Sequence, residues 1–127
     1  MTSIFTKIIQ WEIPCTKIYE DELCFAFLDI NPVTKGHTLV IPKQEIERIW
    51  QIPDDLLAHM MYISKKLMKQ MINNLWVDYV QLTIEWLEVP HAHIHLIPNM
   101  KENHIVSYTH TAYQDNEAQD IANKIKI

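Results

Sequence analysis

The sequence predicts an α+β fold, in which a mostly antiparallel sheet carries one long helix on one face. Short apolar stretches bounded by Asn, Pro or Gly recur along the chain and indicate strands. One long stretch, residues 53–76, instead has apolar residues at helical spacing. A chain of 127 residues is long enough to bury a core, so we expect one domain over residues 1–127.

The N-terminal segment predicts a short helix over residues 4–11. Ser3 is a favourable N-cap for this helix, and Pro14 ends the segment. Helical spacing indicates a buried face made of Ile4, Ile8 and Trp11.

Strands are expected next, over residues 16–21, 23–30 and 37–43. The first two strands meet at Asp21 and Glu22, which predicts a hairpin. The following segment opens with Asn-Pro and predicts a turn, in which Gly36 supplies a positive φ. Pro42 stops the third strand.

The long helix has a continuous apolar stripe. The stripe consists of Leu56, Met60, Ile63, Leu67 and Met71, and it is widened by Leu57, Met61, Met68 and Ile72. Asp54 and Asp55 occupy the first turn, where the helix dipole favours carboxylates. We expect this stripe to pack on the sheet.

The second half of the chain predicts two further strands and a last helix. The strands cover residues 79–86 and 91–98, and residues 87–90 join them as a short loop. Residues 115–127 have the pattern of a C-terminal helix.

Composition narrows the class of protein. Apolar residues make up 48% of the chain and the net charge is −5, which argues against a protein that binds nucleic-acid backbones. No apolar run reaches the roughly 18 residues that a membrane span needs, and no signal peptide is recognisable. Cys15 and Cys24 show no CxxC spacing, which indicates free thiols. We therefore expect a cytoplasmic protein that contacts neither membranes nor nucleic acid.

The histidines of HAHIHLIP, residues 91–98, are the main functional signal. Because side chains alternate on a strand, one face carries His91, His93 and His95, and the other carries Ala92, Ile94 and Leu96. Gly36 is the only glycine, which excludes a glycine-rich phosphate loop. Phosphate binding would therefore depend on side chains or on a few backbone amides.

Three interpretations of this row are open. A metal site would need ligands from elsewhere, such as His37 or Glu88, because three imidazoles in a straight row converge poorly on one ion. A solvated face without function is the second interpretation. The third is nucleophilic catalysis, in which a neutral imidazole nitrogen of His93 attacks phosphorus and the flanking histidines donate to phosphoryl oxygens.

HAHIHLIP resembles the signature of the histidine-triad (HIT) family, in which three histidines alternate with apolar residues. SIFTKIIQWEIPCTKIYEDELCFAFLDINPVTKGHTLVIPK resembles the N-terminal half of HIT hydrolases, and PDDLLAHMM resembles the start of their long helix. The resemblance covers roughly residues 3–98 and leaves a tail, 99–127. It implies a HIT-like, five-stranded antiparallel sheet with one long and one or two short helices, in a protein that commonly forms homodimers.

The resemblance implies roles for the histidines. His93 corresponds to the family's nucleophile toward the α-phosphate of a nucleotide. His91 and His95 correspond to positions that orient the nucleophile and hydrogen-bond the phosphate or the leaving group. His37 corresponds to the histidine that backs the triad.

The resemblance also implies a nucleoside site. Asp29 corresponds to the acidic residue that binds the ribose hydroxyls, since two acceptor oxygens suit a vicinal diol. Phe5, Ile8 and Phe27 resemble the apolar wall around the base, and packing in the core is an equal alternative for these three.

Two segments depart from the family pattern. Some HIT proteins bind structural zinc through an N-terminal CxxC and histidines, and here Ser3 and Thr6 stand at the cysteine positions, so we expect no metal. Many relatives have a longer loop before the triad, with Asn-Gly and Gly-Gln pairs. This chain has the short EWLEVPH instead, with Trp86, Leu87 and Glu88.

The resemblance therefore predicts an enzyme that acts at the α-phosphate of nucleoside phosphoramidates or dinucleoside polyphosphates through a nucleotidyl-histidine. Its partner is a small nucleotide, and it needs no cofactor. The alternative is a nucleotide-binding HIT-fold protein with little or no turnover, and the shortened loop motivates it.

Overall fold

The computed structural model describes residues 2–85, 89–103 and 110–127. Within those ranges the helices are α1 (Ile4–Ile9), α2 (Asp54–Asn74) and α3 (Glu117–Ile125), with a 3-10 turn at Ile49–Gln51. The strands are β1 (Lys17–Glu20), β2 (Cys24–Leu28), β3 (Thr38–Pro42), β4 (Tyr79–Ile84) and β5 (Ile94–Asn99). These elements confirm the predicted α+β class.

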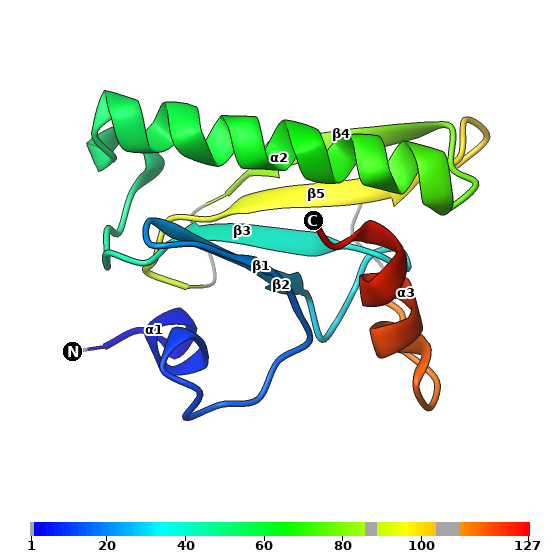
Figure 1. Cartoon of the computed structure of the whole chain (residues 1–127), viewed down its shortest axis with the longest axis horizontal. Coiled ribbons are helices and arrows are strands. Elements are labelled where there is room, and N and C mark those ends of the chain that lie inside the picture. The colour runs from blue at the N-terminus through cyan, green and yellow to red at the C-terminus, as the bar shows by residue number, and fades with distance from the viewer. Residues whose placement is uncertain (1, 86–88, 104–109) are drawn as a thin grey trace.

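The strands form one sheet in the order β1-β2-β3-β5-β4, and all of its neighbours are antiparallel. β5 therefore lies between β3 and β4, with His95 opposite Leu39 on one side and Thr83 on the other. Figure 1 shows the long α2 and the short α1 on opposite sides of this sheet. The chain segment that carries the histidines is consequently held in the middle of the sheet.

The face of the sheet under α2 is apolar. It buries Ala26, Val40, Ala92, Ile94 and Leu96 against Leu56, Met60, Ile63, Leu67 and Met71 of α2 and against Ile121, Ala122 and Ile125 of α3. The predicted helix stripe is thus confirmed. Met61 and Ile72, which were expected to widen the stripe, are exposed instead.

The opposite face holds a second, smaller cluster beneath α1. Phe5 and Ile8 of α1 pack with Phe25, Phe27, Leu39 and Ile41. Ser3 caps α1 as predicted, because its side chain accepts a hydrogen bond from the Thr6 amide. The predicted buried face of this helix is confirmed for Ile8 and was wrong for Ile4 and Trp11, which are exposed, while Phe5 is buried. The helix ends at Ile9 and Trp11 has a φ of 61°, so helical spacing does not extend that far.

The fifth strand begins later than predicted. His91 and His93 precede β5, because the amide of Ala92 donates to the carbonyl of Ile46 at 2.7 Å rather than to a strand. The strand also continues through Pro98 to Asn99. Pro98 is tolerated because β3 reaches only to the level of Leu96, so that Pro98 pairs with β4 alone.

Two further expectations concern single features. Gly36 has a φ of 98°, as predicted for the turn before β3, and a Cβ there would lie 2.9 Å from Leu75 Cδ1.

None of the helices in the described part of the chain is long and apolar enough to cross a membrane.

Candidate active site

Four histidines lie on the face of the sheet that α1 covers. His95 is in β5, His37 directly precedes β3, and His91 and His93 lie in the extended segment before β5. All four are buried, with at most 7% of each residue exposed. Since Ala92, Ile94 and Leu96 point into the core on the α2 side, the predicted division of the two faces is confirmed.

The ring of His91 is held at both nitrogens. Nε2 lies 2.8 Å from the carbonyl oxygen of Pro42, which can only accept, so Nε2 carries the proton. Nδ1 therefore accepts from the Ser3 hydroxyl at 2.7 Å. Both nitrogens of this ring are therefore engaged by the protein, and the predicted role of His91 in catalysis stays a prediction.

His93 has one nitrogen bound and the other free of protein hydrogen bonds in the described residues. Its Nδ1 lies 2.7 Å from the carbonyl oxygen of His91, so Nδ1 carries the proton. In a neutral ring Nε2 then keeps a lone pair. Phe5 packs edge-on against the ring, with centroids 5.0 Å apart, and fixes its plane. A fixed imidazole with an unprotonated Nε2 is the form that can act as a nucleophile.

His37 and His95 form a hydrogen-bonded pair with a defined direction. The Val33 amide donates to His37 Nδ1 at 3.0 Å, which leaves the proton of His37 on Nε2. His37 Nε2 lies 2.9 Å from His95 Nδ1, so it donates there and His95 carries its own proton on Nε2. Within the described residues this Nε2 is buried and has no hydrogen-bond partner. The site therefore contains one unsatisfied N–H donor beside the His93 ring, whose centroid is 4.8 Å from that of His95.

Burial keeps these rings neutral. Loss of hydration, with added repulsion from neighbouring imidazoles, lowers the pKa of His37 to about 4 and that of His95 to about 3. Burial also lowers the pKa of His91. At neutral pH these three rings are uncharged, in agreement with the directions of the hydrogen bonds.

Two carboxylates approach the ends of the row. Asp29 Oδ2 lies 3.7 Å from His37 Nε2, and burial raises the pKa of this carboxyl. Glu85 Oε2 lies 3.9 Å from His95 Nε2. Glu85 was not among the residues singled out from the sequence, because its position relative to His95 depends on the pairing of β4 with β5.

The tail also reaches the Asp29 end of the row. His110 Nδ1 donates to the Asn31 carbonyl at 2.7 Å, and the Thr111 amide donates to the Pro32 carbonyl at 2.8 Å. No local sequence pattern indicates this long-range contact of His110.

The residues predicted to surround a base are packed together. Phe5, Ile8 and Phe27 are buried in the α1 cluster, and Phe5 and Phe27 stack edge-on with centroids 5.6 Å apart. Phe5 therefore connects this apolar cluster to the His93 ring, which it also contacts. Their role as a base wall stays a prediction, and so does the ribose role of Asp29. Trp86, Leu87 and Glu88 of the shortened loop lie outside the described residues.

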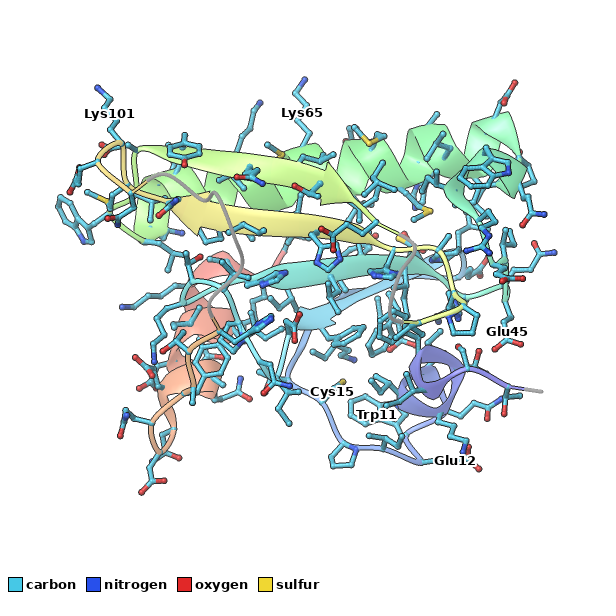
Figure 2. All side chains as sticks on the ribbon, turned by 180° about the vertical axis from the view of Figure 1, so that it is seen from behind. Trp11, Glu12, Cys15, Glu45, Lys65 and Lys101 are labelled. Carbon is cyan, nitrogen blue, oxygen red and sulfur yellow. The ribbon has the colours of Figure 1, made fainter. Side chains whose placement is uncertain are left out.

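In the N-terminal segment, where some HIT proteins bind zinc, the polar groups of this chain are engaged in hydrogen bonds. Thr6 Oγ1 donates to Glu45 Oε1 at 2.8 Å, the Ser3 amide donates to the same oxygen, and the Ser3 hydroxyl holds His91. Figure 2 shows Glu45 beside the start of α1. Two hydroxyls, one carboxylate and an imidazole with both nitrogens in use do not fit structural zinc, which favours thiolate and free imidazole ligands.

Two other described groups bring possible metal ligands within 4.8 Å of one another. In Asp29, His37 and His95, the nitrogens of His37 are both in hydrogen bonds. In the second group, Asp21 accepts hydrogen bonds from His59 and Tyr19, and Cys24 lies 3.8 Å from the same oxygen. In each group, protein hydrogen bonds therefore already engage at least one of the possible ligands.

A five-stranded antiparallel sheet with a buried row of histidines opposite its long helix defines a HIT-fold protein. A model of the HIT domain family matches residues 10–102, and the chain belongs to this family.

Known relatives agree with this assignment. The chain is 44% identical over 100 residues to an uncharacterised HIT-like protein of Methanocaldococcus jannaschii, covering 75% of this chain and 77% of that protein. It is 43% identical over 100 residues to an adenosine 5′-monophosphoramidase of Saccharomyces cerevisiae, covering 78% and 63%. A zinc-bound histidine triad protein of Mycobacterium smegmatis has a similar structure, with a TM-score of 0.85, 26% identity and coverage of 98% and 94%.

Proposed function

We propose that this protein is a nucleotide hydrolase or nucleotidyl transferase that acts at the α-phosphate of a nucleoside phosphoramidate or a dinucleoside polyphosphate. One observation carries the proposal. His93 donates from Nδ1 to a backbone carbonyl, which leaves Nε2 unprotonated, and its ring lies beside that of His95, whose Nε2–H has no partner among the described residues. The activity that names the yeast relative, an adenosine 5′-monophosphoramidase, supports the same chemistry.

In the proposed first step, His93 Nε2 attacks the α-phosphorus in line with the leaving group. The bond between phosphorus and the leaving group breaks, and the leaving group departs with the electron pair while it accepts a hydrogen bond from the His95 Nε2–H and takes a proton from water. The His37 N–H, fixed by the Val33 amide, orients the His95 ring for this hydrogen bond. His37 is thus a positioning residue.

In the second step, water attacks the nucleotidyl-His93. The water oxygen bonds to phosphorus, the water gives up a proton to the solvent, and the electron pair of the P–N bond returns to His93. The reaction releases a nucleoside monophosphate. The side chains named here carry both steps, and we propose that no cofactor or metal is needed.

The same proposal includes how the nucleoside is bound. Asp29 accepts hydrogen bonds from the ribose hydroxyls, while Phe5, Ile8 and Phe27 provide apolar surface near the base. The Asn31 amide donates to Asp29 Oδ1 at 2.9 Å, which leaves Oδ2 for a ligand. Only a small-molecule nucleotide is proposed as substrate.

We further propose a cytoplasmic homodimer. The free thiols of Cys15 and Cys24 support a reducing compartment. The position of β4 at one edge of the sheet supports a dimer in which two sheets join, because an edge strand presents unpaired backbone groups. Sedimentation velocity of the purified chain tests the dimer, and a monomer at micromolar concentration would contradict it.

The decisive experiment measures product release from adenosine and guanosine phosphoramidates and dinucleoside polyphosphates, with wild type beside His93→Ala. We expect nucleoside monophosphate from the wild type and a loss of at least about 10³-fold in kcat for the variant. If the wild type binds nucleoside monophosphate but turns over none of these substrates, the alternative applies: a nucleotide-binding HIT protein with little or no turnover.

A further inference from the structure

Glu85 extends the site beyond the triad. It directly follows β4, in which Thr83 pairs with His95. Because residues two apart on a strand share a face, Glu85 continues the face that carries Thr83 and His95. Its Oε2 lies 3.9 Å from His95 Nε2, and about a third of its side chain, 34%, is exposed.

The contact between these two groups is an approach and not a bond. A distance of 3.9 Å is too long for a hydrogen bond, and the His95 Nε2–H has no other partner in the described ranges. A substrate atom that accepts from this N–H therefore lies beside the Glu85 carboxylate. In the proposed mechanism that atom belongs to the leaving group.

Among the residues that the structure describes, the charged groups near the histidines do not neutralise the negative charge of Glu85. The rings of His37 and His95 are neutral, and the other carboxylate, Asp29, adds negative charge at the far end of the row. The lysines beside β3 are paired elsewhere, Lys43 with Glu20 at 2.7 Å and Lys35 with Glu117 at 2.7 Å. Each negative charge on a leaving group therefore meets repulsion that grows as distance falls.

We propose that Glu85 is a specificity-determining residue that selects substrates by the charge of the leaving group, favouring leaving groups without negative charge over polyphosphates. This inference rests on the proposed function, since it assigns the space beside His95 to the leaving group. Glu85 acts on discrimination between substrates and takes no part in bond making.

The test compares two substrates that share the adenylyl group. Adenosine 5′-phosphoramidate releases ammonia, whereas diadenosine tetraphosphate releases ATP. The measured quantity is the ratio of kcat/KM for the tetraphosphate to kcat/KM for the phosphoramidate. The enzymes are wild type, Glu85→Gln, Glu85→Asp and the control Glu22→Gln, which removes the same charge from the exposed turn between β1 and β2.

We expect Glu85→Gln to raise this ratio about tenfold, equivalent to about 1.4 kcal/mol, because the amide removes the charge and keeps the shape. Glu85→Asp and Glu22→Gln should leave the ratio within about twofold. In the wild type, raising the ionic strength should raise the ratio in the same direction, since salt screens a partly exposed carboxylate.

The possible outcomes distinguish this inference from the proposed function on which it rests. A ratio that is equal in wild type and Glu85→Gln, with phosphoramidate turnover that depends on His93, overturns the role of Glu85 and leaves the function standing. Absence of wild-type turnover on both substrates overturns the proposed function and this inference with it.

Discussion

The two faces of the central strand are buried to a similar degree but are held by different forces. Ile94 and Leu96 face α2 and belong to the apolar core cluster on that side. His93 and His95, their neighbours in sequence, face α1 and are held by directed hydrogen bonds at 2.7 and 2.9 Å. Apolar packing tolerates small shifts, whereas each imidazole is fixed in one orientation and one tautomer.

This difference separates stability from chemistry along a single strand. Burial of apolar surface on the α2 face stabilises the sheet. On the other face, burying imidazoles is unfavourable unless they are neutral and hydrogen-bonded. The α2 face therefore supplies the stability that allows a polar row to be kept in a dry environment.

The largest effect is expected from breaking the apolar face. Ile94→Ala removes a side chain that is completely buried and should lower the free energy of unfolding by about 2–5 kcal/mol. Chemical denaturation followed by tryptophan fluorescence measures it. The matched variant is His93→Asn, one position away, whose amide can still donate to the His91 carbonyl. It should cost less than about 1.5 kcal/mol while turnover is lost. Equal destabilisation by both variants would contradict the conclusion that the α2 face stabilises the protein and the histidine face serves the chemistry.

Acid should weaken the histidine face selectively. Unfolded His37 and His95 bind protons near the ordinary pKa of 6.5, whereas the folded protein holds their pKa values at about 4 and about 3. Below pH 6.5 the unfolded state therefore binds more protons than the folded state, and stability falls as the pH falls. Between pH 7 and pH 5 we expect a loss of about 4 kcal/mol, measured by denaturation at each pH.

The same pH window allows a control. Carboxyls with lowered pKa values, such as those of Glu20 and Glu117, lose their contribution only below their ordinary pKa of 4.5. His95→Gln should therefore flatten the curve between pH 6.5 and pH 5. A wild-type stability that is constant from pH 7 to pH 5 would show that the rings are not held neutral.

A smaller loss of stability than for Ile94→Ala is expected from breaking the connection between α1 and the row. Ser3→Ala removes both the helix cap and the hydroxyl that donates to His91, and should cost about 1–2 kcal/mol. Because His91 also presents the carbonyl that holds His93, kcat should fall about tenfold with little change in KM. Ser3→Thr keeps the hydroxyl and should restore most of kcat. A variant Ser3→Ala with unchanged kcat would limit Ser3 to capping.

Much of the fold and part of the site could be predicted from local patterns. The stripe of α2 and the alternation around Ile94 are periodic, and a periodic pattern of burial can be recognised from neighbouring residues alone. Ile8 was predicted correctly in the buried face of α1, whereas Trp11 was mispredicted because its positive φ is not encoded by spacing. The start of β5 was mispredicted because the Ala92 amide bonds to Ile46, which is distant in sequence.

By itself, the sequence determined the class of fold, the face on which the histidines lie and the central position of His93 among them, because these properties follow from alternation within a few residues. Only the tertiary structure decided which nitrogen of each ring carries its proton. That depends on acceptors and donors brought from elsewhere: the Pro42 carbonyl for His91, and the Val33 amide, acting through His37, for His95. It also decided that Glu85 stands beside His95, since the register between two strands sets which side chains meet.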